Sequence, residues 1–131
     1  MDHEVRDETT RRFIAALRKV EQDGDLDGLA GLFTDDAEVL SIDGHGPRQG
    51  QDGIRELFRE YVGQFDRLST TFTQVTEGEN RSALEWTTDA VRPGGHEVTY
   101  TGVTVIDRDG ERCTGFRTIY DSARLMQKVA P

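Results

Sequence analysis

GLFTDDAEVLSIDGHGPRQGQDGIRELFREY, residues 31–61, is the stretch that decides the fold. It starts at the end of an apolar helical segment and passes through a turn at residues 35–36 into a short apolar strand over residues 39–42. A loop rich in glycine follows, and then a helix that begins near Gln51. This order predicts a curved sheet that closes over helices.

Apolar residues upstream recur at helical spacing and predict an amphipathic helix over residues 7–22. The other faces of this helix are expected to carry charged side chains such as Glu21. Gly24 should stop it, and Asp25 is a candidate N-cap for a short second helix. A third helix should end at Gly63. The inward stripes of the three helices are Phe13, Ile14, Leu17 and Val20; Leu26, Leu29, Leu32 and Phe33; and Ile54, Leu57, Phe58, Tyr61 and Val62.

Residues with β-branched and aromatic side chains dominate the chain from residue 66 onward and predict strands. Turn signals at residues 77–80, 92–96 and 107–110 separate these strands into an antiparallel meander. Three N-terminal helices followed by such a meander predict an α+β fold. We expect a cone-shaped curved antiparallel sheet with the helices covering its concave face, in one domain over residues 1–131.

Two patterns disagree about the inward face of the strand over residues 82–91. Alternation turns Leu84 and Trp86 inward, whereas a two-residue turn at Gly94–Gly95 would pair Asp89 with Tyr100 on one face. We give more weight to burial, because a longer turn costs little and exposing each of the two apolar side chains costs about 2 kcal/mol. A core position and a place in a cavity lining both suit Trp86.

The composition limits the classes of function. Sixteen Lys and Arg against 25 Asp and Glu give a formal net charge of -9, which argues against nucleic acid as a partner. The first ten residues are rich in charged side chains where a signal peptide would be apolar, and no apolar run approaches membrane length. Cys113 is the single cysteine, which suits a reducing cytoplasm. We therefore expect a cytoplasmic protein without membrane partners, and the lack of metal-ligand spacing predicts neither metal nor cofactor.

Three motifs in order, D-D-A-E-V (35–39), G-x-G-P-R-x-G (44–50) and I-R-E-L-F (54–58), resemble the signature of the nuclear transport factor 2 superfamily. The likeness is to its SnoaL-like and ketosteroid isomerase-like branch and extends over about residues 13–124. The resemblance implies an apolar cavity for a small molecule. It also implies a homodimer through the outer sheet face, which here would include Val103.

The resemblance allows the ketosteroid isomerase site to be compared position by position. The catalytic base falls on Ser41, the tyrosine that stabilises the oxyanion falls on Leu17, and the protonated acid falls on Gly102. The two supporting tyrosines fall on Phe33 and Phe58. Because only Ser41 could take part in proton transfer, and weakly, isomerisation by that mechanism is not expected.

Two other enzymes of the superfamily offer comparisons. The arginine and two aspartates of limonene epoxide hydrolases fall nearest to Trp86, Thr88 and Thr118, although a shift of one residue would bring in Asp89. That triad is therefore not evident. SnoaL-like polyketide cyclases need only one acid/base group in an apolar pocket, which makes them the enzymatic precedent that this sequence contradicts least.

Four side chains are candidates for chemistry or ligand orientation. His45 would edge the cavity mouth in this fold and titrates near neutrality, although a loop histidine is more often solvated. Asp121 follows an apolar strand, where desolvation would raise its pKa, although capping the strand's exit is the commoner role of such a carboxylate. Tyr100 and Tyr120 could orient a ligand carbonyl or hydroxyl, or could be core residues.

These features predict a domain with an apolar pocket for a small hydrophobic molecule of polyketide-like or steroid-like type. An enzyme of this kind would be an isomerase, cyclase or hydratase working by acid/base catalysis, with His45 or Asp121 carrying the proton. The alternative is a non-catalytic ligand-binding or dimerisation module of the same fold. The predicted pocket lining is Leu17, Phe33, Ser41, Phe58, Trp86, Tyr100, Phe116, Thr118 and Tyr120.

Overall fold

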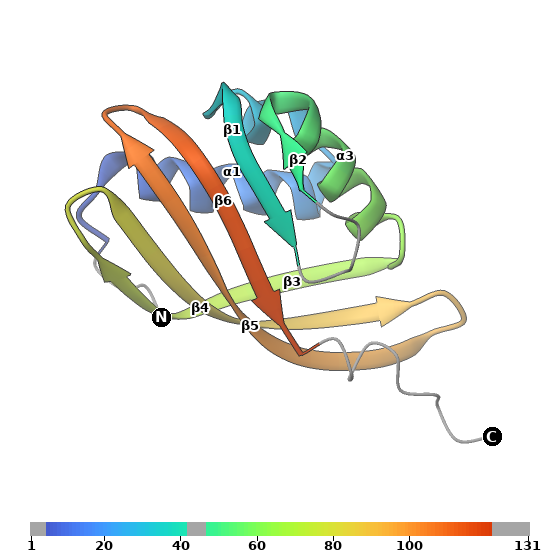
Figure 1. Cartoon of the computed structure of the whole chain (residues 1–131). Coiled ribbons are helices and arrows are strands. Elements are labelled where there is room, and N and C mark those ends of the chain that lie inside the picture. Colours follow the sequence, from blue (N-terminus) through green and yellow to red (C-terminus); the bar gives the residue numbers. More distant parts are fainter. Residues whose placement is uncertain (1–4, 42–46, 122–131) are drawn as a thin grey trace.

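A computed structural model describes residues 5–41 and 47–121 and shows an α+β fold (Figure 1). One curved, unclosed sheet has the strand order β2-β1-β6-β5-β4-β3. No helix in these two segments is long and apolar enough to cross a membrane. The elements are α1 (Glu8–Asp23), α2 (Leu26–Ala30), β1 (Phe33–Ser41), β2 (Arg48–Gln49), α3 (Gly50–Val62), β3 (Arg67–Glu77), β4 (Arg81–Arg92), β5 (His96–Asp109) and β6 (Arg112–Tyr120).

Helix α1 begins and ends close to where the sequence pattern places it. The carboxylate of Asp7 caps its first turn by accepting a hydrogen bond from the Thr10 N–H at 2.6 Å. Gly24 closes its last turn in the left-handed conformation, with φ 72°. The Thr10 hydroxyl also lies 2.8 Å from the Ser82 hydroxyl of β4, so the first turn is attached directly to the sheet.

The start of β1 differs from the prediction. A turn was expected at Asp35–Asp36, but β1 already begins at Phe33, and its pairing with β6 shifts register between Phe33 and Glu38. Both acidic side chains are exposed, so an extended backbone accommodates them without burying charge. Strand β6 supports this start, because the Cys113 N–H donates to the Leu32 carbonyl at 2.7 Å. Ile42, also predicted in this strand, lies outside the described residues.

The C-terminal half is the antiparallel meander that the turn signals predict. Strands β3, β4, β5 and β6 pair antiparallel in chain order. Strand β1 then joins β6 in a parallel pair, which extends the sheet toward β2 (Figure 1). The N-terminal elements are thereby brought beside the last strand, far away in sequence.

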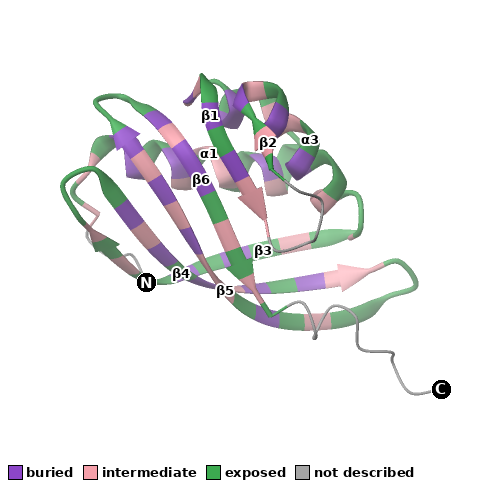
Figure 2. Ribbon diagram, viewed as in Figure 1, coloured by how far each residue is buried: buried purple, intermediate pink, exposed green. Residues whose placement is uncertain are grey.

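The β4–β5 hairpin resolves the conflict about the inward face. Arg92 pairs with His96, so the turn contains three residues, and Thr88 rather than Asp89 lies opposite Tyr100. Trp86 therefore faces the buried side of the sheet, as the burial argument predicted, and only 6% of it is exposed. Figure 2 shows the resulting alternation of buried and less buried positions along β4.

Aromatic rings from both layers form the core around Phe116 of β6. Its ring centroid lies 6.2 Å from that of Phe13 in α1, 5.7 Å from that of Phe58 in α3 and 6.3 Å from that of Phe33 in β1. All four side chains are buried. Since burying each such ring contributes about 1.5–3 kcal/mol, this cluster holds α1 and α3 against the same face of the sheet.

We expect two glycines with similar backbone angles to respond differently to alanine. Gly24 and Gly50 have φ of 72° and 71°, but a Cβ at Gly24 meets nothing within 4 Å, whereas one at Gly50 would lie 2.4 Å from the Asp35 carbonyl oxygen. Gly24→Ala should lose about 1–2 kcal/mol of unfolding free energy through backbone strain. Gly50→Ala should lose about 1–3 kcal/mol more through the clash. Urea unfolding measures both, and equal losses would refute the close approach.

Candidate functional site

A row of polar side chains crosses the inner face of three neighbouring strands. Thr70 of β3 lies opposite Thr88 of β4, which lies opposite Tyr100 of β5. At one end of the row, Glu21 of α1 accepts hydrogen bonds from the Thr70 hydroxyl at 2.5 Å and from the Thr70 N–H at 3.1 Å. At the other end, the Tyr100 hydroxyl is hydrogen-bonded to the Tyr61 hydroxyl of α3. Five elements thus contribute polar groups to one site.

Glu21 is the ionisable group that the sequence pattern placed wrongly. It was expected on a charged outer face of α1, but it is half-buried and bonded to the sheet. Burial raises the pKa of the Glu21 carboxyl, and the hydrogen bonds from Thr70 and the charge of Arg18 only partly oppose this effect. Glu21 follows Leu17 by four residues, so the helical repeat continues the inward stripe and could have revealed it.

The hydroxyl row also has a direction. When Glu21 is ionised, the Thr70 hydroxyl gives it its only proton. The Thr88 hydroxyl, 2.8 Å away, must then donate to Thr70. A charge on Glu21 is therefore stabilised by a chain of two hydroxyls and one backbone N–H. This arrangement lets the carboxyl group hold a proton or release it with little movement of its neighbours.

Tyr61 and Tyr100 form a neutral pair of hydroxyl groups. Burial raises the pKa of Tyr61 well above its usual value, and the neighbouring Tyr100 and Glu21 raise it further. Burial also raises the pKa of Tyr100. Both groups therefore keep their protons at physiological pH. Because the pair has two protons and its mutual hydrogen bond uses one, the other is available to donate to an acceptor oxygen.

Trp86 lies beside this hydroxyl pair and is held by its own polar contact. Its indole N–H donates to the Thr104 hydroxyl at 2.9 Å. Its ring meets Tyr100 edge-on at 5.7 Å between centroids and lies 6.4 Å from Tyr120. Gly102 stands opposite Trp86 in the register, and a Cβ there would lie 2.5 Å from the indole ring. Glycine at this position therefore allows the indole to lie across β5 toward β6.

The rings around Trp86 form a continuous set that we call the aromatic cluster, namely Tyr61, Phe65, Trp86, Tyr100 and Tyr120. Within it, the Tyr61 centroid lies 5.6 Å from that of Phe65 and 6.3 Å from that of Tyr120. Tyr61, Phe65 and Tyr120 are half-buried, whereas Trp86 and Tyr100 are buried beneath them. Tyr61 and Phe65 were not among the predicted lining residues.

The predicted lining residues separate into neighbouring groups. Phe58 connects them, because its ring contacts both Phe116 and Tyr61, at 5.7 and 6.3 Å between centroids. Phe33, Phe58 and Phe116 lie in the core together with Trp86 and Tyr100, and the last two also belong to the aromatic cluster with Tyr120. Leu17 is half-buried against the core, and Ser41 and Thr118 are half-buried opposite one another on β1 and β6. That these residues line a pocket stays a prediction.

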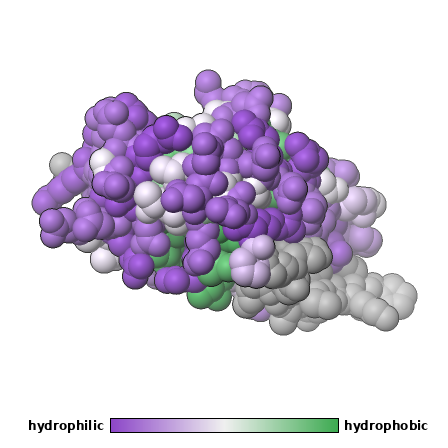
Figure 3. All heavy atoms as spheres, turned by 45° about the horizontal axis from the view of Figure 1, so that its top comes forward, coloured by the Kyte–Doolittle hydropathy of each residue, from purple (hydrophilic) through white to green (hydrophobic). Residues whose placement is uncertain are grey.

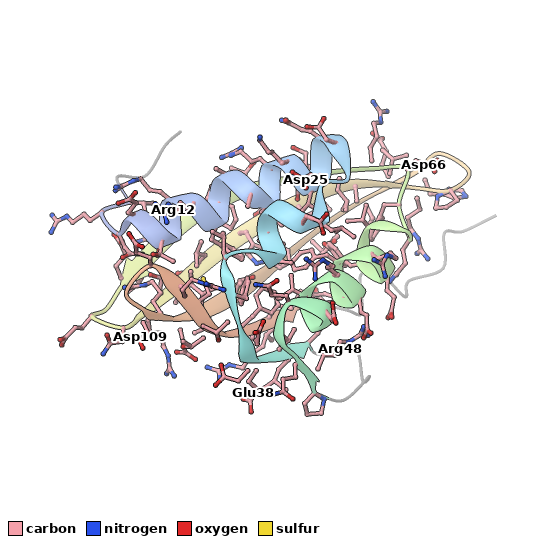
Figure 4. All side chains as sticks on the ribbon, turned by 90° about the horizontal axis from the view of Figure 1, so that it is seen from above. Arg12, Asp25, Glu38, Arg48, Asp66 and Asp109 are labelled. Carbon is pink, nitrogen blue, oxygen red and sulfur yellow. The ribbon has the colours of Figure 1, made fainter. Side chains whose placement is uncertain are left out.

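Of the two predicted proton carriers, the described structure places only Asp121. Asp121 is exposed just after β6, where its N–H donates to the Thr101 carbonyl at 3.1 Å. This is the position of a residue that ends a strand. His45 lies outside the described residues, so its role stays a prediction. Charged side chains such as Arg12, Asp25 and Glu38 lie at the periphery (Figure 4).

Other chemistry has little support in the described segments. They hold no group of three or more His, Cys, Asp or Glu side chains that could bind a metal ion. Burial raises the pKa of the Cys113 thiol to about 12, so this side chain stays protonated and is a poor nucleophile near neutral pH. Glu21 and the tyrosine hydroxyls are therefore the groups on which acid/base chemistry at this site would depend.

Solved structures place the fold in a known class. An NTF2-like protein from Anabaena variabilis ATCC 29413 superimposes with a TM-score of 0.81 at 16% identity, over 93% of this chain and 95% of the other. TerC, co-crystallised with polyporic acid, gives 0.77 at 18% identity over 91% and 96%. A ketosteroid isomerase-like protein from Catenulispora acidiphila DSM 44928, in complex with trimethylamine, gives 0.77 at 16% identity over 91% and 93%. The chain therefore has the NTF2-like fold.

The sequence itself defines the family more narrowly. Residues 10–116 match the SnoaL-like domain. Because this match spans most of the chain, the protein belongs to the SnoaL-like domain family. The resemblance drawn from the three motifs of residues 35–58 is confirmed.

Replacing the half-buried Glu21 carboxyl should change how stability depends on pH. Since burial raises the folded-state pKa of Glu21, the folded protein binds this proton more tightly, and ionisation costs stability as pH rises through that pKa. The unfolding free energy of the wild type relative to Glu21→Gln should therefore fall between about pH 4 and pH 7. Urea unfolding at both pH values measures this, with the exposed Glu38→Gln as control. A difference that does not change with pH would contradict the assignment.

Proposed function

We propose that this domain binds a small hydrophobic molecule at the aromatic cluster, of polyketide-like or steroid-like type. The observation that carries the proposal is the Tyr61–Tyr100 hydroxyl pair, which stands among aromatic rings with one proton available. Large rings provide contact area at low entropic cost, and the hydroxyl pair would orient a carbonyl or hydroxyl oxygen of the ligand. An apolar pocket at this position is part of the proposal.

The structural relatives support a small-molecule site in this fold. TerC was crystallised with polyporic acid, and the Catenulispora acidiphila protein is in complex with trimethylamine. Both relatives are less than 20% identical to this chain. They therefore support the binding of a small molecule, but not its chemical type. The cytoplasmic location stays a prediction from the composition.

The same site would support acid/base catalysis of an isomerase, cyclase or hydratase type. Glu21 is half-buried and hydrogen-bonded by Thr70, in the row that leads through Thr88 to Tyr100. A carboxyl with a raised pKa beside hydroxyl donors is suited to moving a proton while an oxygen is stabilised. His45 and Asp121 remain the carriers predicted from sequence, and a non-catalytic binding module is the alternative.

We expect the neutral ketone 1-tetralone to bind the wild type and to quench Trp86, the only tryptophan. Tyr61→Phe should weaken this binding by about 2- to 10-fold, because the ketone oxygen loses a donor. Fluorescence titration measures the affinity. Thr101→Val is the matched control, since it removes an exposed hydroxyl from the opposite face of β5. The proposal fails if 1-tetralone does not bind, or if Tyr61→Phe binds it as the wild type does.

We also infer that the outer face of the sheet joins two copies of the chain. Val103 of β5 faces outward and lies opposite Ile119 of β6, with Val105 two residues further along β5. Ile119 is 53% exposed and is the only large hydrophobic side chain exposed to this degree among residues 5–41 and 47–121. The face of the molecule drawn in Figure 3 is largely hydrophilic. An exposed apolar strip on such a protein is a favourable place for association.

A charge in the strip should dissociate the dimer. Ile119→Glu would place two carboxylates at the contact, because a twofold interface repeats every substitution. Native mass spectrometry of the freshly purified protein should show dimers for the wild type and monomers for Ile119→Glu. Gln64→Glu adds the same charge at an exposed position after α3 and should remain dimeric. A monomeric wild type would refute the interface.

A further inference from the structure

We propose that the outer edge of β3 is a latent interaction surface, which helix α1 covers and which pairs with the same strand of a second copy of the chain when the cover is released. Two glutamates, Glu21 and Glu77, hold the cover in place by hydrogen bonds. The inference is independent of any ligand, because it concerns the edge of the sheet and the contacts of α1 along it.

Strand β3 is an edge strand with the composition that favours pairing. It has 11 residues, whereas β2 at the opposite edge of the sheet has 2. An edge strand presents N–H and C=O groups that no neighbouring strand uses, so another chain can pair with it. Residues 68–76 of β3 carry no charge, glycine or proline and are rich in β-branched side chains. Such segments pair readily with copies of themselves when an edge is open.

Glu21 of α1 occupies this edge near the start of β3. The Thr70 N–H donates to the Glu21 carboxylate at 3.1 Å, and the Thr70 hydroxyl donates to it at 2.5 Å. Because this N–H is bonded to a helix side chain, it points away from β4 and is one of the groups that an added strand would use. Alternation along the strand directs the Leu68 N–H to the same edge. The carboxylate therefore takes the place of a partner strand's carbonyl.

Glu77, the last residue of β3, makes the reciprocal contact at the other end. Its carboxylate accepts hydrogen bonds from the Arg6 N–H at 2.9 Å and from the Asp7 N–H at 2.7 Å, just before α1. The helix rises about 21 Å between Asp7 and Glu21, and β3 spans about 23 Å between Thr70 and Glu77. These lengths match, so α1 contacts β3 in the antiparallel direction with a glutamate contact at each end.

The middle of the edge is irregular. The pairing of β3 with β4 shifts register between Phe72 and Gln74, which leaves Thr73 without a partner. A bulge of this kind bends an edge strand and makes it a poorer template for another chain. The bulge and the two glutamate contacts therefore protect the same edge. The glutamate contacts can be removed by substitution without changing the length of the strand.

Hydrogen exchange tests the Glu21 contact in the wild type. The Thr70 amide should exchange at least about tenfold more slowly than the Leu68 amide, whose N–H faces the same edge and is not bonded to Glu21. Glu21→Ala should remove this difference. Amide exchange followed by NMR measures both rates, and equal rates in the wild type would overturn the inference.

Removing both glutamate contacts should open the edge. Glu21→Ala/Glu77→Ala should form species larger than the wild type at about 100 μM, because an unpaired edge associates in this concentration range. Glu38→Ala/Glu111→Ala removes two exposed carboxylates and should keep the wild-type size. Light scattering coupled to size exclusion measures the mass. The dimer proposed for the outer sheet face does not use this edge, so each variant is compared with the wild type.

A lysine on β3 distinguishes strand pairing from general unfolding. Gln74→Lys adds a charge at an exposed position of the edge strand and should return Glu21→Ala/Glu77→Ala to the wild-type size. Gln64→Lys adds the same charge at an exposed position after α3 and should not. The inference is overturned if removing both glutamates leaves the size unchanged, if Gln74→Lys fails to restore it, or if both lysines restore it equally.

Discussion

The register of the β4–β5 hairpin is the constraint on which the site depends. Side chains alternate across a strand, so a shift of one residue would move every inward side chain of β4 to the opposite face. The three-residue turn sets Thr88 rather than Asp89 opposite Tyr100. Gly94 and Gly95 make this turn possible, with φ of 96° and 86°. Asp89 is thereby left exposed, bonded at 2.7 Å to the Thr99 hydroxyl.

Helix α1 is attached to this sheet near both ends, and the two attachments have different characters. At its first turn, Asp7 pairs with the buried Arg108 at 3.3 Å, and Arg108 also donates to the carbonyls of Gly78 and Arg81. At its last turn, the only polar attachment in the described structure is Glu21 with Thr70. The first holds a charge that is fully paired. The second involves a carboxyl without an ion pair in the described structure, whose pKa is raised by burial.

The sequence predicted the fold well because its signals are local. The Asp25 cap, the glycine after each long helix and the three turn signals each act over a few residues. The start of β1 was predicted wrongly because its support comes from β6, about eighty residues later, through the Cys113 and Arg112 hydrogen bonds to Leu32 and Phe33. Asp35 and Asp36 themselves lie where the pairing with β6 shifts register, so the local turn signal corresponds to an irregularity inside the strand and not to a turn before it.

The site was only half predictable, for a related physical reason. Trp86, Tyr100 and Tyr120 follow from alternation along single strands. The helical repeats place Tyr61, and by extension Glu21, on inward faces, but their partners Tyr100 and Thr70 lie across the layer and do not follow from a helix pattern. A charged residue near a helix end is usually solvated, so the pattern assigned Glu21 to the outside. Only the packing of α1 on the sheet shows that Thr70 of β3 lies against Glu21.

The comparison with the ketosteroid isomerase site, made from the sequence, can be set beside the geometry at one position. It places the protonated acid of that enzyme on Gly102, and the structure leaves no room there for a larger residue because the Trp86 indole occupies the space beside it. Glu21, the half-buried carboxyl on this inner face, lies one helical turn beyond Leu17 on α1 and is bound by Thr70. The packing of the indole against Gly102 is therefore a physical reason why that position carries no acid in this chain.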